Sequence, residues 1–243
     1  MKEQHLIIGE MPAILFGEAS KQLFLFVHGQ GGNKEEARAF ATVVCPIGWQ
    51  VLGIDLPEHG ERVGGSISFD PWHVVPELHQ VMQYARANWQ QIALRANSIG
   101  SWFSLLAFSG EPLVQCLLVS PLVDMERMIR NLMHWSGITE ERLKREKVIP
   151  TDFGQTLSFE YLSYVRAHTI DAWDVPTFIL CAEKDEQIDA DTVETFSTRF
   201  GCKLTVIEGG EHWFHTPEER SILCQWEAES LKKSQEQEAF CTI

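Results

Sequence analysis

Basic side chains are scarce in this chain. Its 243 residues carry 20 lysines and arginines against 34 aspartates and glutamates, which gives a formal net charge of −14. Proteins that hold nucleic acids need the opposite sign, because lysine and arginine neutralise the phosphates. The composition therefore argues against a nucleic-acid partner. The negative net charge affects solubility and the steering of charged ligands, and it does not identify a partner by itself.

Long apolar runs and closely spaced cysteines are absent as well. No segment approaches the roughly 20 apolar residues of a membrane span, and the first residues, MKEQHLIIGEMP, contain no apolar stretch of signal-peptide length. The six cysteines are scattered singly without a C-x-x-C motif, so neither a disulfide framework nor a zinc knuckle is expected. These features predict a protein of the reducing cytoplasm that makes no membrane contact. The alternative is a protein exported by a route that the sequence does not show.

What the chain does contain is an alternation of short apolar runs with longer segments of helical spacing. This alternation predicts an α/β protein in which parallel strands are joined by crossover helices. The first two strands are separated only by Glu10-Met11-Pro12, which is too short for a helix, so they are predicted to pair antiparallel. The expected strands are His5–Gly9, Ala13–Phe16, Leu23–His28, Gln50–Ile54, Ile92–Ala96, Val114–Ser120, Thr177–Cys181 and Lys203–Ile207. The expected helices are Lys34–Val44, Trp72–Trp89, Ile99–Phe108, Ala190–Phe200 and Pro217–Leu231.

Residues 124–171 interrupt this alternation. They contain the segments MERMIRNLMHW, TEERLKREK and SFEYLSYVRAH and no convincing strand. An insertion after the carboxyl end of a strand lies over the ligand crevice of such a sheet, which predicts a small helical cap on a core of residues 1–123 and 172–243. A plain, long crossover is the alternative. Met128 and Trp135 are candidates for lining a substrate pocket, and the other interpretation is that they pack against the core.

The strongest local signal is the segment 92–101, IALRANSIGS, in which an apolar strand runs into a helix across Ser98. The residues two positions before and after it, Ala96 and Gly100, are small. A turn of this kind holds a serine in a strained backbone conformation, and only small neighbours let the strand and the helix approach. Ser98 is therefore the candidate nucleophile. A helix N-cap is the alternative role.

A second strand, FLFV, ends in a glycine-rich loop, His28-Gly29-Gln30-Gly31-Gly32. Glycines let backbone N–H groups approach a developing oxyanion, because no Cβ intervenes. The competing interpretation is a phosphate loop. The segment fits neither G-x-x-x-x-G-K-[ST] nor G-x-G-x-x-G, and Lys34 is followed by two glutamates, so phosphate binding is disfavoured.

A serine nucleophile requires a base and an orienting acid, because its hydroxyl is weak until an imidazole takes the proton. Asp185 and His212 follow the last two predicted strands, at the edge of the sheet where the Ser98 turn also lies. Asp124 is a rival for the acid and His215 for the base. The pair His212-x-x-His215 also suggests a metal, but it lacks a third ligand and the spacing of a zincin helix, so no metal is expected.

These motifs together resemble the α/β-hydrolase fold family, and within it the small bacterial serine esterases and monoacylglycerol-lipase-like enzymes. The resemblance rests on HGQG at 28–31, Ser98 in its turn, EKDEQID at 183–189 and GGEHWF at 209–214, and DLPEHG at 55–60 is similar too. It implies an eight-stranded sheet, a Ser98–His212–Asp185 triad, and an oxyanion hole made by the N–H groups of Gln30 and Ile99. Ala96 departs from the usual glycine, and Asn97 stands where many relatives have histidine.

The expected function is that of a serine hydrolase that cleaves a small carboxylic ester through an acyl-enzyme, without a cofactor. The same fold hosts peptidases, thioesterases and carbon–carbon hydrolases with the same triad. Two alternatives from other classes are a ligand-binding or sensing module that keeps the fold with little turnover, and a scaffold whose acidic surface meets a basic partner.

Overall fold

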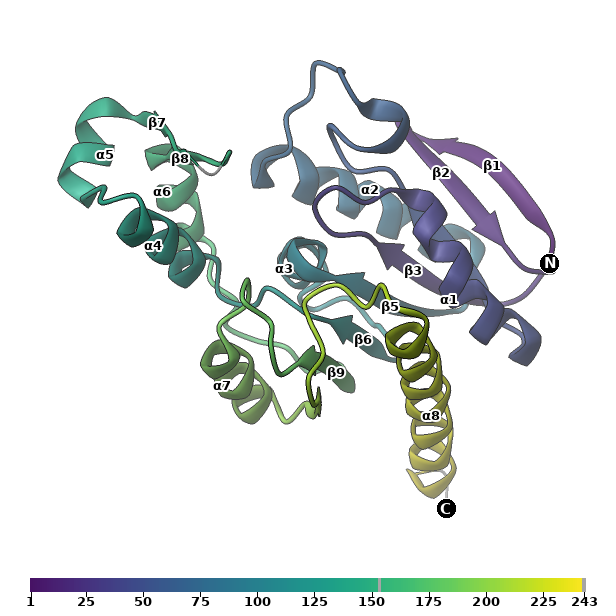
Figure 1. Ribbon diagram of the computed structural model, residues 1–243. Helices are drawn as coiled ribbons and strands as arrows, with labels where there is room; N and C mark the ends of the chain where they lie inside the picture. Colours follow the sequence, from purple (N-terminus) through teal and green to yellow (C-terminus); the bar gives the residue numbers. More distant parts are fainter. Residues whose placement is uncertain (153, 242–243) are drawn as a thin grey trace.

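The computed structural model describes residues 1–152 and 154–241 of the chain (Figure 1). Eight strands form one sheet in the order β1-β2-β4-β3-β5-β6-β9-β10. Their bounds are β1 Glu3–Ile8, β2 Met11–Phe16, β3 Gln22–Val27, β4 Gln50–Ile54, β5 Gln91–Asn97, β6 Cys116–Val119, β9 Thr177–Ala182 and β10 Lys203–Ile207. All eight predicted strands are found, with ends that shift by a few residues.

The sheet is parallel except at one edge. β1 pairs antiparallel with β2, and β2 pairs antiparallel with β4, whereas every other neighbouring pair is parallel. The antiparallel pairing of the first two strands was expected from their short connection, and it is confirmed. The parallel strands send their carboxyl ends to one edge of the sheet, which is where the connecting loops gather.

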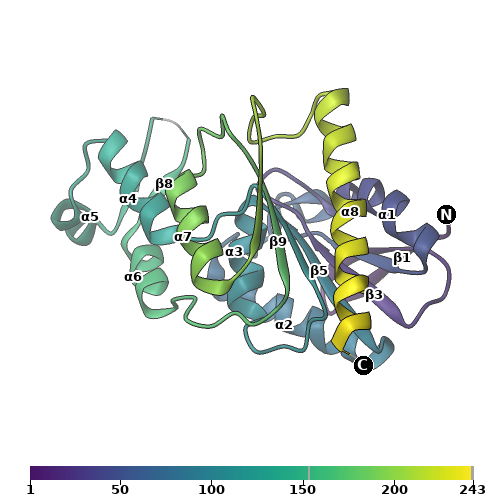
Figure 2. The same ribbon diagram turned by 90° about the horizontal axis from the view of Figure 1, so that it is seen from below.

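Helices cover both faces of the sheet, as predicted for the fold class. Helices α1 and α8 pack on one face with Phe24 and Phe26 of β3, whereas α2, α3 and α7 pack on the other with Leu23 and Leu25 of the same strand (Figures 1 and 2). The alternation along β3 shows why the strand reads as continuously apolar: both of its faces are buried. The helices are α1 Ala37–Val44, α2 Pro71–Asn88, α3 Ser98–Ala107, α4 Met125–Trp135, α5 Glu140–Glu146, α6 Phe159–Ala167, α7 Ala190–Phe200 and α8 Pro217–Cys241, with short 3₁₀ turns η1 Lys34–Glu36, η2 Cys45–Ile47 and η3 Gly60–Arg62.

Between β6 and β9 the chain leaves the sheet and forms α4, α5 and α6, which lie together to one side of it (Figure 1). The expectation that this segment has no strand was wrong. Two three-residue strands, β7 Val148–Pro150 and β8 Thr156–Ser158, pair antiparallel inside it. Strands this short carry too few residues for an alternating pattern to be recognised.

Aromatic rings join this insertion to the core. Tyr161 of α6 stacks on Trp102 of α3 at a centroid distance of 6.0 Å and meets Trp72 of α2 edge-on at the same distance. Tyr164, one turn further along α6, lies 5.9 Å from Trp72. Aromatic pairs of this kind add to the stabilisation from buried area, so they hold α6 against α2 and α3. In the described part of the chain no helix is both long and apolar enough to cross a bilayer.

Candidate active site

Ser98 occupies the turn between β5 and α3, and its backbone is strained. Its φ angle is +47°, in the left-handed region that side chains other than glycine rarely adopt. The turn closes tightly because Gly100 has no side chain: a Cβ there would lie 2.2 Å from the carbonyl oxygen of His28. A Cβ on Gly29 would likewise lie 3.1 Å from Ser98 Cβ. A glycine at position 100, two residues after the serine, is therefore required because α3 approaches the loop after β3 so closely.

Ser98, His212 and Asp185 form one connected array, although 114 residues separate the first two. Ser98 Oγ lies 3.1 Å from His212 Nε2, and His212 Nδ1 lies 2.7 Å from Asp185 Oδ2. The His212 and Asp185 side chains are almost fully buried. With Nδ1–H donating to the carboxylate, Nε2 is left as the acceptor for the serine proton. The structure thus brings together the three residues that sequence reasoning selected.

The loop after β9 fixes the Asp185 carboxylate. Its Oδ1 accepts hydrogen bonds from the backbone N–H groups of Gln187 and Ile188, both at 2.9 Å. Its other oxygen, Oδ2, is the one that faces His212. Each oxygen therefore has its own partner, and the carboxylate cannot rotate without losing both.

The glycine-rich loop after β3 is held by two buried histidines that bond to the backbone. Gly31 N–H donates to His59 Nε2 at 2.9 Å, and His59 Nδ1 lies 2.7 Å from the carbonyl oxygen of Pro57. His28 accepts from Leu56 N–H through Nε2 and bonds to the Gly29 carbonyl oxygen through Nδ1. Burial lowers the pKa of His28 to about 4, so its ring is neutral at pH 7.

Within the described residues, the N–H groups of Gln30 and Ile99 form no hydrogen bond with backbone or side chains. Gln30 precedes the anchored Gly31, and Ile99 directly follows Ser98 in the first turn of α3, where N–H groups have no partner inside the helix. Both donors are therefore available to a ligand. An oxyanion hole requires free N–H donors beside the nucleophile, so these two groups stay the candidates for it.

Lys34, at the start of η1, forms ion pairs within the protein. Its ammonium group is buried and lies 2.8 Å from Asp55 Oδ2 and 2.7 Å from Glu61 Oε1. Burial opposes the charge, but the hydrogen bonds to these carboxylates outweigh it and raise the pKa of Lys34. Asp55 Oδ1 also accepts from Lys34 N–H at 2.8 Å. Lys34 thus ties the loop after β3 to the loop after β4, and its ammonium group is taken up by these two carboxylates.

Two residues that sequence reasoning missed hold the His212 loop. Ser120, at the end of β6, has a left-handed φ of +43°, and its Oγ donates to the carbonyl oxygen of His212 at 3.0 Å. The Glu219 carboxylate accepts from the N–H groups of His215 and Thr216, at 3.2 and 3.0 Å. Glu219 N–H donates in turn to Thr216 Oγ1 at 3.2 Å, which is a capping box. The T-x-x-E pattern at the start of the predicted helix could have revealed Glu219, whereas no local pattern points to Ser120.

A cavity of about 330 Å³ opens beside Ser98 and is called the Ser98 cavity. It is bounded by the loop after β3, the ends of β5 and β6, the His212 loop and α8. Its lining contains no residue of the 124–171 insertion. The side chains that matter below are Glu36, Arg95, Asn97, Ser98, His212 and Arg220.

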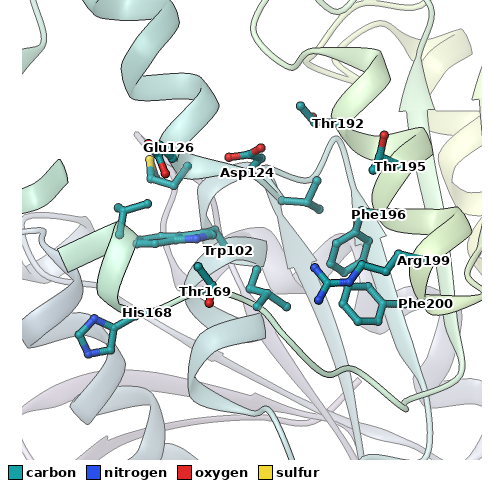
Figure 3. Close-up of a pocket in the computed structure, with 14 residues that line it drawn as sticks. Trp102, Asp124, Glu126, His168, Thr169, Thr192, Thr195, Phe196, Arg199 and Phe200 are labelled. Atoms are coloured by element: carbon teal, nitrogen blue, oxygen red, sulfur yellow. The ribbon is translucent and has the colours of Figure 1, made fainter. Parts of the chain in front are cut away.

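A second cavity of about 290 Å³, called the cap cavity, lies between the insertion and α7 (Figure 3). Trp102, Phe196 and Phe200 supply apolar walls, and Asp124 and Arg199 are polar members of the lining. It contains none of Ser98, Asp185 and His212. Met128 and Trp135, the candidates for pocket lining, border neither cavity. Trp135 is 60% exposed at the end of α4, and Met128 is half-buried against the larger hydrophobic core cluster.

The rival residues occupy other places. Asp124 is the N-cap of α4, and its Oδ1 accepts from Arg127 N–H at 2.9 Å. His215 is exposed, and its Nδ1 bonds to the carbonyl oxygen of Trp213 at 2.8 Å. Among the side chains of residues 1–152 and 154–231, no group of three or more histidine, cysteine, aspartate or glutamate residues is arranged to hold a metal ion.

Comparisons with solved structures place this geometry in a known fold. Est1E from Butyrivibrio proteoclasticus matches 96% of this chain and 98% of its own, with a TM-score of 0.76 and 17% identity. Mouse alpha/beta hydrolase domain-containing protein 10 matches 96% of this chain and 99% of its own, with a TM-score of 0.73 and 14% identity. An esterase from Pyrococcus furiosus has a TM-score of 0.68 at 14% identity over 96% of this chain and 90% of its own. No protein-family model and no curated protein matches the sequence.

The chain has the α/β-hydrolase fold, as the sequence motifs predicted. The structures that it resembles are named as esterases and hydrolases. At these identities the likeness establishes the fold, and the activity has to be argued from the site.

Proposed function

We propose that this protein is a serine hydrolase that cleaves a small carboxylic ester through an acyl-enzyme. The observation that carries the proposal is the hydrogen-bonded array of Ser98, His212 and Asp185, with the serine held at a strained left-handed φ. Strain at a single serine between a strand and a helix is costly, and it is retained where it aims a nucleophile.

In the proposed reaction, Ser98 Oγ attacks the ester carbonyl carbon while its proton moves to His212 Nε2. The N–H groups of Gln30 and Ile99 bind the oxyanion of the tetrahedral intermediate. Its collapse breaks the bond to the alcohol oxygen, which takes the proton from His212 as it leaves. Water then attacks the carbonyl carbon of the acyl-enzyme and gives a proton to His212. The second tetrahedral intermediate collapses by breaking the bond to Ser98 Oγ, which takes that proton back from His212, and the carboxylic acid is released. Asp185 holds the His212 tautomer and stabilises the imidazolium in both halves.

Ester hydrolysis is tested with p-nitrophenyl esters of graded acyl length and with covalent labelling by a fluorophosphonate. The wild-type chain should turn over the esters and take one label, on Ser98. Ser98→Ala should lose the label and about 10⁶ in kcat, as other triad knock-outs do. Ser101→Ala is the matched control, because Ser101 is a buried serine one turn into the same helix. Its hydroxyl has no hydrogen-bond partner, so the label should remain.

Labelling also separates hydrolysis from the alternative of a ligand-binding module. A module that binds without turnover would give neither label nor product, whereas a hydrolase of another bond would be labelled at Ser98 without cleaving the esters. Parallel assays with an acyl thioester and an anilide identify that bond. A label on a residue other than Ser98, or wild-type turnover in Ser98→Ala, would overturn the assignment.

A further inference from the structure

The Ser98 cavity contains two arginines, although the chain as a whole is strongly acidic. Arg95 is 2% exposed, on β5 three residues before Ser98. Its Nε donates to Glu227 Oε1 at 2.9 Å, and its Nη1 bonds to the Ala96 carbonyl oxygen and to Asn97 Oδ1. Its Nη2 forms no hydrogen bond with any described residue. A buried guanidinium therefore borders the cavity with a free donor.

Arg220, in the first turns of α8, is the other arginine of the cavity. Of the eleven arginines in the chain, ten have a carboxylate within 4.0 Å in the described structure. Arg220 is the exception. In a protein with 34 acidic residues, an arginine that has no carboxylate partner among the described residues and lines the same cavity as the nucleophile points to a role in ligand binding.

One carboxylate among the described residues also lines the Ser98 cavity. Glu36 lies against the glycine loop, where a Cβ on Gly32 would come within 2.6 Å of its Oε1. Burial raises the pKa of Glu36, which weakens its hold on a negative charge. The lining therefore contains two guanidinium groups and one carboxyl group, and burial opposes the ionisation of that carboxyl group.

We propose that this cavity binds a carboxylate carried by the substrate, so that the enzyme prefers esters whose acyl part ends in a free carboxylate. A guanidinium donates two parallel N–H groups to a carboxylate, which fixes position as well as charge. The volume of about 330 Å³ is near the lower end for ligand pockets and fits a short dicarboxylic half-ester. The inference rests on the proposed hydrolysis at Ser98 and adds the class of substrate.

The test compares two substrates that differ only in charge. One is monomethyl glutarate, and the other is its neutral isostere, in which an amide replaces the free carboxylate. The measured quantity is the ratio of their kcat/KM values from methanol release. The wild-type ratio should favour the anionic ester by about tenfold or more, because a hydrogen bond to a charged group contributes that much. Arg220→Gln should lower this ratio about tenfold, and Glu36→Gln should raise it.

Arg86→Gln is the matched control, because Arg86 is an exposed arginine on α2, paired with Glu111 outside the cavity. It makes the same change in net charge, so it measures the effect of the overall field on the ratio. The inference is overturned if the wild-type ratio is near one, or if Arg220→Gln and Arg86→Gln change it equally.

A binding measurement keeps this inference separate from the proposed function. Titration calorimetry on the Ser98→Ala chain should give a lower Kd for monomethyl glutarate than for the amide, and adding Arg220→Gln should remove the difference. If the wild-type chain cleaves no ester and Ser98 takes no label, hydrolysis is refuted while the two Kd values still decide the carboxylate site. If esters are cleaved but the two Kd values are equal, only the carboxylate site is refuted.

Discussion

The Ser98 cavity and the cap cavity are of similar volume, but they differ in what lines them. The Ser98 cavity combines the nucleophile, the histidine, the loop residue Gln30 and two arginines, and these come from the carboxyl edge of the sheet, from β5 and from α8. The cap cavity has aromatic walls and residues from the 124–171 insertion, and none of the Ser98, His212 and Asp185 side chains. The volumes of the two cavities do not differ enough to identify the active site. The connected set of proton-transfer groups in the Ser98 cavity identifies it as the candidate.

This comparison also bears on the insertion. An insertion after a strand's carboxyl end is expected to cover the ligand crevice. Here the contacts that anchor it run through Tyr161, Trp72 and Trp102 to α2 and α3, on the sheet face opposite α1 and α8. The proposed chemistry therefore requires no residue of the insertion.

The largest contrast is between two aspartates, one in each region. Asp185→Asn should lower kcat about 10⁴-fold, because the imidazole of His212 then adopts the wrong tautomer. Asp124→Asn should leave kcat near wild type, since Asp124 borders the cap cavity and asparagine is an equally good helix N-cap. Steady-state kinetics on the best ester of the panel measures both. If Asp124→Asn were the inactive variant, the orienting acid would belong to the insertion, and the claim that the chemistry requires no residue of the insertion would be refuted.

A second prediction concerns His28, which holds the loop that carries Gln30 and makes the stability of the protein depend on pH. The pKa of His28 is lowered by burial to about 4, whereas an unfolded histidine titrates near 6.5. The folded state thus binds fewer protons between these values. The contribution of a neutral His28 to the unfolding free energy is fully present above pH 6.5 and is lost as the pH falls toward 4. The loss from His28 amounts to about 3 kcal/mol of unfolding free energy.

Urea unfolding at several pH values measures this loss, and the ring resonances of His28 report its pKa directly. His168→Gln is the control, because His168 is an exposed residue of the cap cavity and its removal should leave the pH slope in place. A His28 ring that titrates near 6.5 would contradict the expectation.

The two regions also differ in how far sequence alone could describe them. Ser98, Asp185 and His212 stand out in the sequence because each lies within a few residues of the end of a strand, and parallel strands bring their carboxyl ends to one edge. Their roles remain predictions, but their proximity needed only the order of the strands. Ser120 could not be found this way, because its contact joins residues 92 positions apart through one rotamer. In the insertion, helical spacing indicated α4 but not which of its faces would be buried, and Met128 and Trp135 were selected without that knowledge.

The contact between Ser120 and the His212 loop should have a moderate effect. Ser120→Ala removes the hydroxyl that holds the carbonyl oxygen of His212, and a small displacement of the imidazole should lower kcat about tenfold with KM unchanged. Ser120→Gly removes the same hydroxyl but tolerates the left-handed φ, so it separates the hydrogen bond from the strain. Equal losses in the two variants assign the effect to the hydrogen bond. A wild-type rate in Ser120→Gly would show that the hydroxyl is not needed.

The smallest effect is expected at Trp135, the last residue of α4 in the insertion. Its side chain is 60% exposed and borders neither cavity, so Trp135→Ala should change the unfolding free energy by less than about 0.5 kcal/mol. Met128→Ala should cost about 1 to 2 kcal/mol, because Met128 is half-buried among apolar neighbours. Neither variant should alter the preference between short and long acyl esters, because the lining of the Ser98 cavity stays intact. A shift in that preference in either variant would mean that α4 closes over Ser98 when substrate binds, and the insertion would then belong to the substrate pocket.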